Sequence, residues 1–206
     1  MKSRFITVEG SDGSGKSTLL LRLQSYVQNR GVNCLFTREP GGTELGEQIR
    51  DLILSRPMTS LTELFLYEAA RAEHVAQVIL PALKSGKFVF CDRFTHSTLA
   101  YQGAARGLPI KLIEQLNRVA TLGLKPDAVI WLKLSPNEAE KRRDTRGGHT
   151  RLDSERKSFH LSVHRSFTAM AKQKQFIVLN ASRSPDEIFD ELISHPLWKK
   201  FFGELS

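Results

Sequence analysis

One segment near the start of the chain reads Gly10-Ser11-Asp12-Gly13-Ser14-Gly15-Lys16-Ser17 and matches the pattern G-x-x-x-x-G-K-[ST] at every fixed position. An apolar run at residues 5–9 precedes it, and a leucine-rich helical pattern follows it. Glycines allow the backbone to wrap closely around phosphate oxygens, and the N-terminus of the following helix points N–H groups at them. The segment therefore predicts a strand, a phosphate-binding loop and a helix, in that order.

This loop is expected to bind ATP or GTP. Lys16 should reach the β- and γ-phosphates, and the hydroxyl of Ser17 should ligate Mg²⁺. The residues expected to contact the nucleotide are Gly10, Ser11, Asp12, Gly13, Ser14, Gly15, Lys16, Ser17 and Thr18.

The rest of the chain alternates short apolar strands with longer helical patterns, which is typical of a parallel sheet built from βαβ units. Strands are expected at residues 5–9, 33–37, 88–92, 128–134 and 175–180. Helices are expected at residues 15–29, 43–54, 61–84, 110–122, 136–145, 153–172 and 185–193, followed by a short terminal helix. We therefore expect one doubly wound α/β domain over residues 1–206. Its class is the three-layer α/β/α P-loop fold, with a five-stranded parallel sheet and a basic lid.

Composition places the chain among ordinary globular proteins, since 40% of its residues are hydrophobic and 25% are charged. No apolar run approaches the roughly 20 residues that a membrane helix needs, and the N-terminal residues show no secretory pattern. Cys34 and Cys91 lie inside apolar strand-like runs, so we expect buried, reduced thiols. These features predict a cytoplasmic protein that does not contact a membrane.

The formal net charge of +8 is concentrated in one region. Residues 141–174 hold ten Lys and Arg residues against three acidic ones. This region can be read as a solvated basic helix, or its segment at about 141–152 as a mobile lid that closes over phosphates. Nucleic-acid binding would call for a basic groove with interleaved aromatic residues, which the clustering does not match.

The apolar run at residues 88–91 ends in Asp92 and Arg93. Because the carboxyl ends of the strands form the ligand crevice of a doubly wound sheet, Asp92 is expected beside Ser17 as a second metal ligand. The alternative is a surface carboxylate that caps the next helix. Arg93 favours the crevice, which needs cations to hold phosphates.

Several further segments, taken with these two, resemble the thymidylate kinases, in the version found in bacteria. They are Thr37-Arg38-Glu39-Pro40-Gly41-Gly42-Thr43, Ala69-Ala70-Arg71, Asp92-Arg93-Phe94 and Ala100-Tyr101-Gln102-Gly103. The similarity runs from residue 5 to about residue 167 and weakens beyond it. It implies an enzyme that transfers the γ-phosphoryl group of ATP-Mg to the 5′-phosphate of dTMP, giving dTDP and ADP for dTTP synthesis. It also implies a homodimer formed through the helices near residues 61–84.

The resemblance also implies roles for residues at the phosphates. Arg93 would bridge the acceptor phosphate and the donor, with Arg38 and Arg50 as further phosphate clamps. Glu39 would lie near the metal, and Asp12 would approach the metal or the sugar of the acceptor. The acceptor phosphate is largely ionised at neutral pH, because its second pKa is about 6, so no general base is required. Catalysis would depend on positioning and on cations.

At the base, the resemblance implies that Tyr67 stacks on thymine and that Arg71 hydrogen-bonds it. The family usually has Phe at the position of Tyr67. Thr98, Tyr101 and Gln102 would complete the thymidine pocket.

The resemblance implies a catalytic arginine either in the phosphate-binding loop or in the lid, and the variable loop positions 11–14 contain no basic residue, so the lid is expected to supply it. Arg142 and Arg146 are favoured for this role, with Arg143 and Arg151 next. His149 shows no pattern of metal ligands and is expected to be an ordinary loop residue.

Two other functions share part of this pattern. Another nucleoside or nucleotide kinase would keep the phosphate-binding loop and Asp92-Arg93 but would have a different acceptor pocket. A GTPase switch would carry an Asn-Lys-x-Asp motif, which the sequence lacks.

Overall fold

Parallel strands form the centre of the structure, a computed structural model that describes residues 3–146 and 150–203. Within these ranges the five strands are β1 (Phe5–Glu9), β2 (Cys34–Arg38), β3 (Phe88–Asp92), β4 (Ala128–Lys133) and β5 (Phe176–Asn180). Their order across the sheet is β2-β3-β1-β4-β5, so β1 is central and β3 and β4 are its neighbours. The predicted parallel five-stranded sheet is confirmed, and each predicted strand boundary is right to within one residue.

Helices connect the strands and continue to the end of the described chain. They are α1 (Lys16–Gln28), α2 (Glu44–Ser55), α3 (Ser60–His74), α4 (Leu80–Lys84), α5 (Thr95–Thr98), α6 (Ile110–Ala120), α7 (Pro136–Arg146), α8 (Lys157–Met170), α9 (Pro185–Ser194) and α10 (Pro196–Phe202). Two π-helical segments, η1 (Val75–Ile79) and η2 (Leu99–Ala105), continue α3 and α5.

Two of the predicted helices need correction, and one helix was not predicted. The helix predicted at 61–84 contains η1, where Leu80 N–H donates to Val75 O. Pro81, one residue further on, cannot donate to the helical ladder. The helix formed by α5 and η2 was not predicted. The helix predicted from residue 153 begins only at Lys157, because Asp153 instead accepts a hydrogen bond from Thr150 N–H in a turn.

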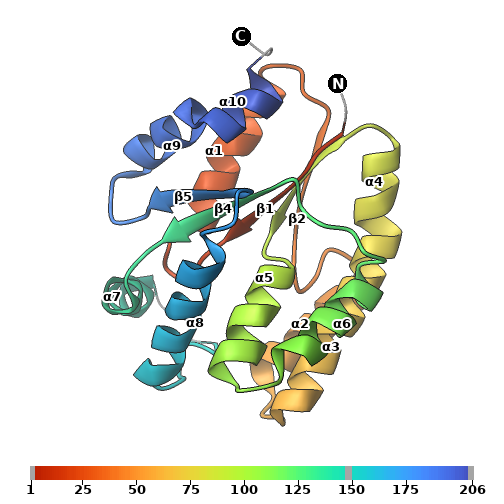
Figure 1. Ribbon diagram of the computed structural model, residues 1–206, viewed down its shortest axis with the longest axis vertical. Coiled ribbons are helices and arrows are strands. Elements are labelled where there is room, and N and C mark those ends of the chain that lie inside the picture. The colour runs from red at the N-terminus through yellow and green to blue at the C-terminus, as the bar shows by residue number, and fades with distance from the viewer. Residues whose placement is uncertain (1–2, 147–149, 204–206) are drawn as a thin grey trace.

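Strand side chains alternate between two buried faces, as a sheet covered on both sides requires. Ile6, Phe90 and Ile130 pack on the face covered by α1, α9 and α10. Val89 and Val129 lie on the opposite face, against η1 with α4 and against α8 with η2 respectively. Figure 1 shows the resulting three layers, with α1, α9 and α10 on one side of the sheet and α3 to α6 and α8 on the other.

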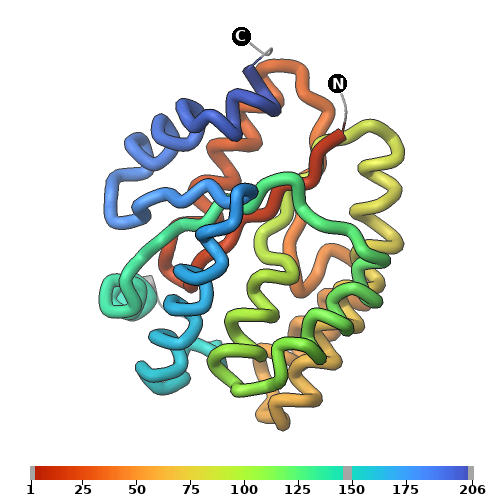
Figure 2. The backbone as a smooth tube through the Cα atoms, viewed as in Figure 1, coloured from red at the N-terminus to blue at the C-terminus, as the bar shows by residue number. Residues whose placement is uncertain are grey.

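The last helix closes the first of these faces. The backbone trace brings α10 back beside the start of β1 (Figure 2), where the guanidinium carbon of Arg4 lies 4.8 Å from the ring centroid of Phe201. Trp198 is buried and stacks on Phe202 with ring centroids 4.2 Å apart. The predicted terminal helix is therefore confirmed as part of the core.

Two smaller observations concern other sequence predictions. Cys91 is buried and Cys34 is half-buried, and both are free thiols. Across the described ranges, no helix combines the length and the apolar character that crossing a membrane requires.

The parallel arrangement brings the predicted site residues to one edge of the sheet. In the strand register, Asp92 at the end of β3 is paired with Val8 of β1 and with Arg38 of β2. The phosphate-binding loop, Asp92 and the segment 37–43 therefore open toward the same crevice.

Candidate active site

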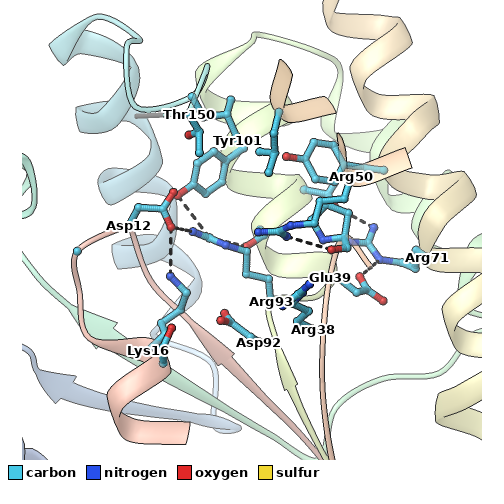
Figure 3. A pocket seen from close by; sticks show the side chains of 18 of the residues that line it. Asp12, Lys16, Arg38, Glu39, Arg50, Arg71, Asp92, Arg93, Tyr101 and Thr150 are labelled. Atoms are coloured by element: carbon cyan, nitrogen blue, oxygen red, sulfur yellow. Dashed lines mark hydrogen bonds and ion pairs between the residues drawn. The ribbon is translucent and has the colours of Figure 1, made fainter. Parts of the chain in front are cut away.

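A cavity of about 460 Å³ occupies this crevice (Figure 3). It brings together most of the predicted site residues, namely Asp12, Gly13, Gly15, Lys16, Ser17, Thr18, Arg38, Glu39, Arg50, Tyr67, Arg71, Asp92, Arg93, Thr98, Tyr101, Gln102 and Arg142. Gly10, Ser11 and Ser14 belong to the same loop but do not line the cavity. The side chain of Arg146 and the lid residues 147–149, His149 among them, lie outside the described part of the structure.

The phosphate-binding loop is held against α7. Gly13 has φ +85°, and a Cβ atom there would lie 2.9 Å from Ala139 O, so a side chain would collide with the helix. Lys16 turns its ammonium group onto the loop, with Nζ 3.1 Å from Gly10 O and 3.2 Å from Ser11 O. Burial lowers the pKa of Lys16 below its ordinary value. The loop thus presents a buried cation whose Nζ lies 3.6 Å from Asp12 Oδ1.

Arg93 extends from the end of β3 into the cavity, toward Asp12 of the phosphate-binding loop. Its backbone has φ +71°, which is rare for a side-chain-bearing residue, and its N–H donates to Val8 O at 2.9 Å. Nη2 donates to Asp12 Oδ1 at 2.8 Å and Nη1 donates to Ser97 Oγ at 3.2 Å. Burial opposes the charged form, but Tyr101, Asp12 and nearby carboxylates raise the pKa of Arg93 well above its ordinary value. Arg93 is therefore a permanent cation within the site.

Glu9 was not predicted as a site residue, and it holds the backbone turn that follows β3 through Phe94 and Ser97. Its Oε1 accepts from Phe94 N–H at 2.9 Å, and its Oε2 accepts from Ser97 Oγ at 2.6 Å. Burial raises the pKa of Glu9 to about 7. The sequence feature that could have identified Glu9 is an acidic residue at the end of an apolar strand, which is also the feature that identified Asp92.

Two residues offer oxygen atoms that could hold a divalent cation. Oδ1 of Asp92 is buried and has no hydrogen-bond partner among the described residues. Ser17 lines the same cavity at the start of α1. Mg²⁺ prefers a few carboxylate or hydroxyl oxygens together with phosphates and water, so these two residues fit this ion.

The opposite end of the cavity contains Tyr67 and the buried guanidinium group of Arg71. Nε of Arg71 donates to Glu39 Oε2 at 2.8 Å. Its Nη1 donates to Glu68 Oε1 at 2.9 Å, to Thr98 Oγ1 at 2.9 Å and to Asn117 Oδ1 at 2.7 Å. Within residues 3–146 and 150–203, Nη2 has no protein partner. Arg71 is therefore rigidly oriented with one donor group left for a ligand.

Glu39 was expected near the metal. Besides lining the cavity, its carboxylate is buried between Arg71 and His74, with Oε1 3.1 Å from His74 Nδ1. The structure thus places Glu39 in direct contact with the arginine expected to read the base.

The two predicted phosphate clamps make weak contacts with the protein. Arg38 has a 55% exposed side chain and pairs with Glu47 at 2.8 Å. Arg50 donates to Pro40 O at 3.0 Å. An exposed ion pair contributes at most about 1 kcal/mol, so Arg38 can exchange its partner for a phosphate at little cost.

The three lid arginines whose side chains the structure describes differ in their surroundings. Arg142 is exposed and lines the cavity, on the helical part of the predicted lid. Arg143 is buried, with Nη1 3.5 Å from Asp12 O and Nε 3.5 Å from Asp153 Oδ1. Arg151 donates to Ile53 O and pairs with Glu63, so it holds the end of the lid against α3.

A second cavity of about 260 Å³ lies on the other side of the phosphate-binding loop. Its lining includes Gly13, Thr18, Arg142, Arg183 and Pro185. Arg183 was not predicted, although its position shortly after β5 places it at the carboxyl edge of the sheet, where ligands of this fold bind.

Two arginine-lined cavities thus meet at one phosphate-binding loop, and the larger one also contains Lys16 and Arg93, two cations that can neutralise phosphates. This arrangement suits the transfer of a phosphoryl group between two anionic substrates. The fold and the site define the chain as a kinase of the P-loop class.

Comparison with known proteins gives the family. The sequence model of the family described as Thymidylate kinase matches residues 8–192. Similar proteins include the thymidylate kinase of Bdellovibrio bacteriovorus, 45% identical over 93% of this chain and 94% of that protein. The thymidylate kinase of Synechococcus sp. (strain JA-2-3B'a(2-13)) is 47% identical over 92% of each chain. The crystal structure of thymidylate kinase from Ehrlichia chaffeensis superposes with a TM-score of 0.77 at 34% identity, covering 94% of this chain and 97% of that one.

This chain belongs to the thymidylate kinase family. The match extends to residue 192, so the resemblance reaches further than the limit of about residue 167 expected from the sequence motifs.

Proposed function

We propose that this chain transfers the γ-phosphoryl group of ATP to the 5′-phosphate of dTMP and thereby produces dTDP and ADP for dTTP synthesis. The observation that carries the proposal is the continuous cavity, which joins Lys16 and Arg93 at its phosphate end to Tyr67 and Arg71 at its base end. Family membership supports the same reaction.

In this reaction an oxygen of the acceptor phosphate bonds to the γ-phosphorus while the bond from that phosphorus to the bridging oxygen of ADP breaks. The attacking oxygen is already ionised, so the barrier includes the repulsion between two anions. We propose that Arg93 and Lys16 offset it, with Arg93 between the two phosphates and Lys16 on the donor. Arg38 and Arg50 would hold the acceptor phosphate, because a guanidinium group binds phosphate oxygens bidentately.

Ser17 and Asp92 are the residues that would hold Mg²⁺. When bound, the cation would neutralise charge on the β- and γ-phosphates of the donor. Asp12 contacts both Arg93 and Lys16 and would keep these cations in place. In the complex with both substrates it would also face the metal or the acceptor sugar.

The base of dTMP would lie on the ring of Tyr67, with a carbonyl oxygen accepting from Nη2 of Arg71. An arginine only donates hydrogen bonds, so this contact favours a carbonyl group over the amino group of cytosine. Thr98 keeps Arg71 in place, and Tyr101 and Gln102 complete the pocket.

The base and ribose of ATP would occupy the second cavity, between Arg142 and Arg183. Arg142 lines both cavities, whereas Arg143 and Arg151 are engaged by the protein. We therefore propose Arg142, together with Arg146, as a catalytic cation from the lid. We also propose Glu39 and Asp12 as supporting carboxylates.

The functional unit would be a cytoplasmic homodimer of single-domain chains that binds neither nucleic acid nor membrane. Exposed apolar side chains on α2 and α3 support the dimer, with Leu45 49%, Leu52 48%, Leu61 44% and Phe65 51% exposed. A sedimentation measurement on the chain and on Phe65→Lys tests this arrangement, since a monomeric wild-type chain would contradict it.

The function is tested by ADP release from ATP-Mg²⁺ with a panel of acceptors. We expect phosphorylation of dTMP, weaker phosphorylation of dUMP, and scarcely any of AMP, GMP or CMP. Lys16→Ala provides the control for contaminating kinases and should abolish the signal. Preference for AMP or for unphosphorylated thymidine would overturn the acceptor while leaving the kinase class intact.

A further inference from the structure

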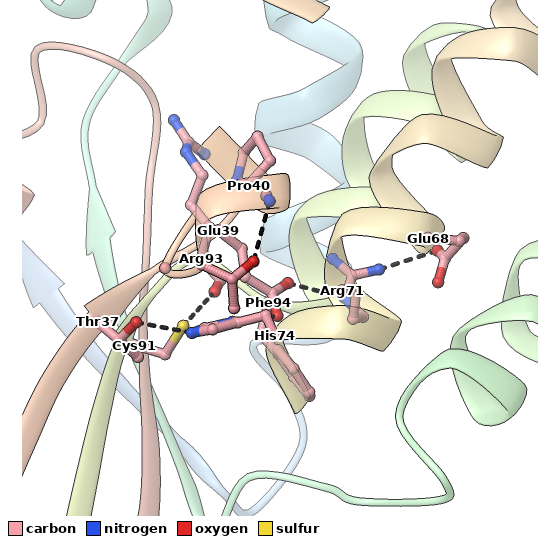
Figure 4. A network of polar contacts seen from close by, with 12 residues as sticks. Thr37, Glu39, Pro40, Glu68, Arg71, His74, Cys91, Arg93 and Phe94 are labelled. Atoms are coloured by element: carbon pink, nitrogen blue, oxygen red, sulfur yellow. Dashed lines mark hydrogen bonds and ion pairs between the residues drawn. The ribbon is translucent and has the colours of Figure 1, made fainter. Parts of the chain in front are cut away.

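A buried histidine at the end of α3, His74, contacts the carboxylate that orients Arg71 (Figure 4). His74 is 0% exposed, so it cannot touch a ligand in the cavity. It nevertheless lies one hydrogen bond from Glu39 and two from Arg71. Its contacts connect β2, the segment after it and the base end of the cavity.

The hydrogen bonds of this network have a defined direction. Oε1 of Glu39 lies 3.1 Å from His74 Nδ1, and a carboxylate only accepts, so Nδ1 carries the proton and donates. In the neutral imidazole Nε2 is then an acceptor, and the hydroxyl of Thr37 donates to it at 2.7 Å. The other oxygen of Glu39 accepts from Arg71 Nε at 2.8 Å. His74 therefore fixes the rotation of the Glu39 carboxylate about its own axis, and that carboxylate fixes Arg71.

The absence of a side chain at Gly42 makes room for the ring of His74. A Cβ atom on Gly42, which has φ +79°, would lie 2.5 Å from His74 Nε2 and 2.8 Å from Thr37 Oγ1. The segment 37–43 thus makes three contributions to the network. Thr37 donates to the imidazole, Glu39 accepts from it, and Gly42 leaves room for the ring.

Cys91 adds a third polar atom to the cluster, and the ligand atoms of Glu39, His74 and Cys91 all lie within 4.8 Å of one another. A soft divalent cation such as Zn²⁺ uses ligands of these types. However, Cys91 Sγ already donates to Arg93 O at 3.1 Å, and both ring nitrogens of His74 have partners. The atoms satisfy one another without an ion, so the observations favour a hydrogen-bonded network.

We propose that His74 is a positioning residue for recognition of the acceptor base and acts through Glu39 on Arg71. The inference rests on the proposed function, because it requires Arg71 to contact the base. Removing the hydrogen bond to Oε1 leaves a buried carboxylate oxygen without its donor, and the carboxylate rotates to find another. Arg71 then loses its alignment at the base, while the phosphate-binding loop, on another part of the cavity, keeps its structure.

A matched pair of variants separates this role from general packing. In His74→Asn the side-chain amide nitrogen takes the place of Nδ1 and still donates to Glu39. In His74→Gln the side-chain amide nitrogen reaches the place of Nε2 instead, and it therefore does not donate to Glu39. We expect His74→Gln to raise the KM for dTMP about tenfold, the cost of a hydrogen bond to a charged group. His74→Asn should restore that KM to within about threefold of the wild-type value, and the KM for ATP should stay near wild type in both variants.

Equal dTMP KM values for the two variants, or parallel rises in the KM for ATP and for dTMP, would overturn the inference. A wild-type chain that does not phosphorylate dTMP would instead overturn the proposed function. If His74→Gln fails to fold, Thr37→Val and Thr37→Ser replace it. Valine removes the hydroxyl that donates to Nε2 and should raise the dTMP KM severalfold, whereas serine keeps the hydroxyl and should not. Equal dTMP KM values for Thr37→Val and Thr37→Ser would again contradict the role of His74.

Discussion

Nη2 of Arg93 lies 2.8 Å from Oδ1 of Asp12, so the arginine that follows β3 is paired with the carboxylate in the middle of the phosphate-binding loop. Nζ of Lys16 lies 3.6 Å from the same oxygen. Figure 3 shows these three side chains side by side at one end of the cavity, with Arg71 and Glu39 at the other. Asp12 therefore holds both cations where the two substrate phosphates are proposed to meet.

Replacement of Arg93 tests the importance of this cation. We expect Arg93→Ala to lower kcat on the order of 10³-fold, because the charge that develops between the phosphates loses its guanidinium partner. Arg93→Lys keeps the charge but not the bidentate geometry, so its kcat should lie between that of Arg93→Ala and that of the wild-type chain. Steady-state kinetics with saturating ATP and dTMP measures the effect. A wild-type kcat in Arg93→Ala would exclude the bridging role.

Asp92 is expected to set the dependence of the reaction on Mg²⁺. In Asp92→Asn the side chain keeps its shape but loses the charge that attracts the cation. Activity measured against Mg²⁺ concentration should require about tenfold more of the cation for half-maximal rate. The control is Asp51→Asn on the exposed face of α2, whose Mg²⁺ curve should match that of the wild-type chain. Matching curves for both variants would remove Asp92 from the proposed metal site.

Glu9 is expected to make stability depend on pH. Its folded pKa of about 7 lies above the ordinary value of 4.5, so the stability it contributes is present at acid pH and is lost as the pH rises through about 7. Glu9→Gln can accept from Phe94 N–H and donate to Ser97 without a charge. The free energy of unfolding of the wild-type chain, relative to that of Glu9→Gln, should fall by about 3 kcal/mol between about pH 4 and pH 8. Denaturant unfolding of both chains without nucleotide measures it. A pH-independent difference would show that Glu9 does not titrate in this range.

Glu63 is expected to anchor the end of the lid. It is 1% exposed and accepts from Gln102 Nε2 at 2.7 Å, from Arg106 Nε at 3.2 Å and from Arg151. Glu63→Ala leaves two largely buried guanidinium groups without this partner, which should lower the free energy of unfolding by about 3 kcal/mol.

The same variant should raise the KM for dTMP, because Gln102, a proposed pocket residue, loses the bond that orients it. Glu114→Ala, at an exposed position of α6, serves as the matched control and should change neither quantity. An unchanged free energy of unfolding in Glu63→Ala would contradict the anchoring role.

Local patterns in the sequence were sufficient for most of the fold. Strands buried on both faces read as continuous apolar runs, such as residues 88–91, and the glycine pattern before Lys16 marked the loop between β1 and α1. The helix at Thr95–Ala105 escaped notice because it begins directly after the positive-φ turn at Arg93 and has no apolar stripe of helical period. The helix predicted at 153–172 began too early because Asp153 accepts a hydrogen bond from Thr150 N–H in a turn, and a periodic pattern does not reveal such a bond.

For the site, the sequence alone determined which kinds of residue were present and, through the phosphate-binding motif and the register of parallel strands, that many of them would face one crevice. Only the tertiary structure decided their partners. Glu39 meets His74 and Arg71 across 35 and 32 residues of chain, and Glu63 meets Arg151 across 88. Such contacts depend on how helices pack against the sheet, and the spacing of residues along a chain does not encode that packing locally.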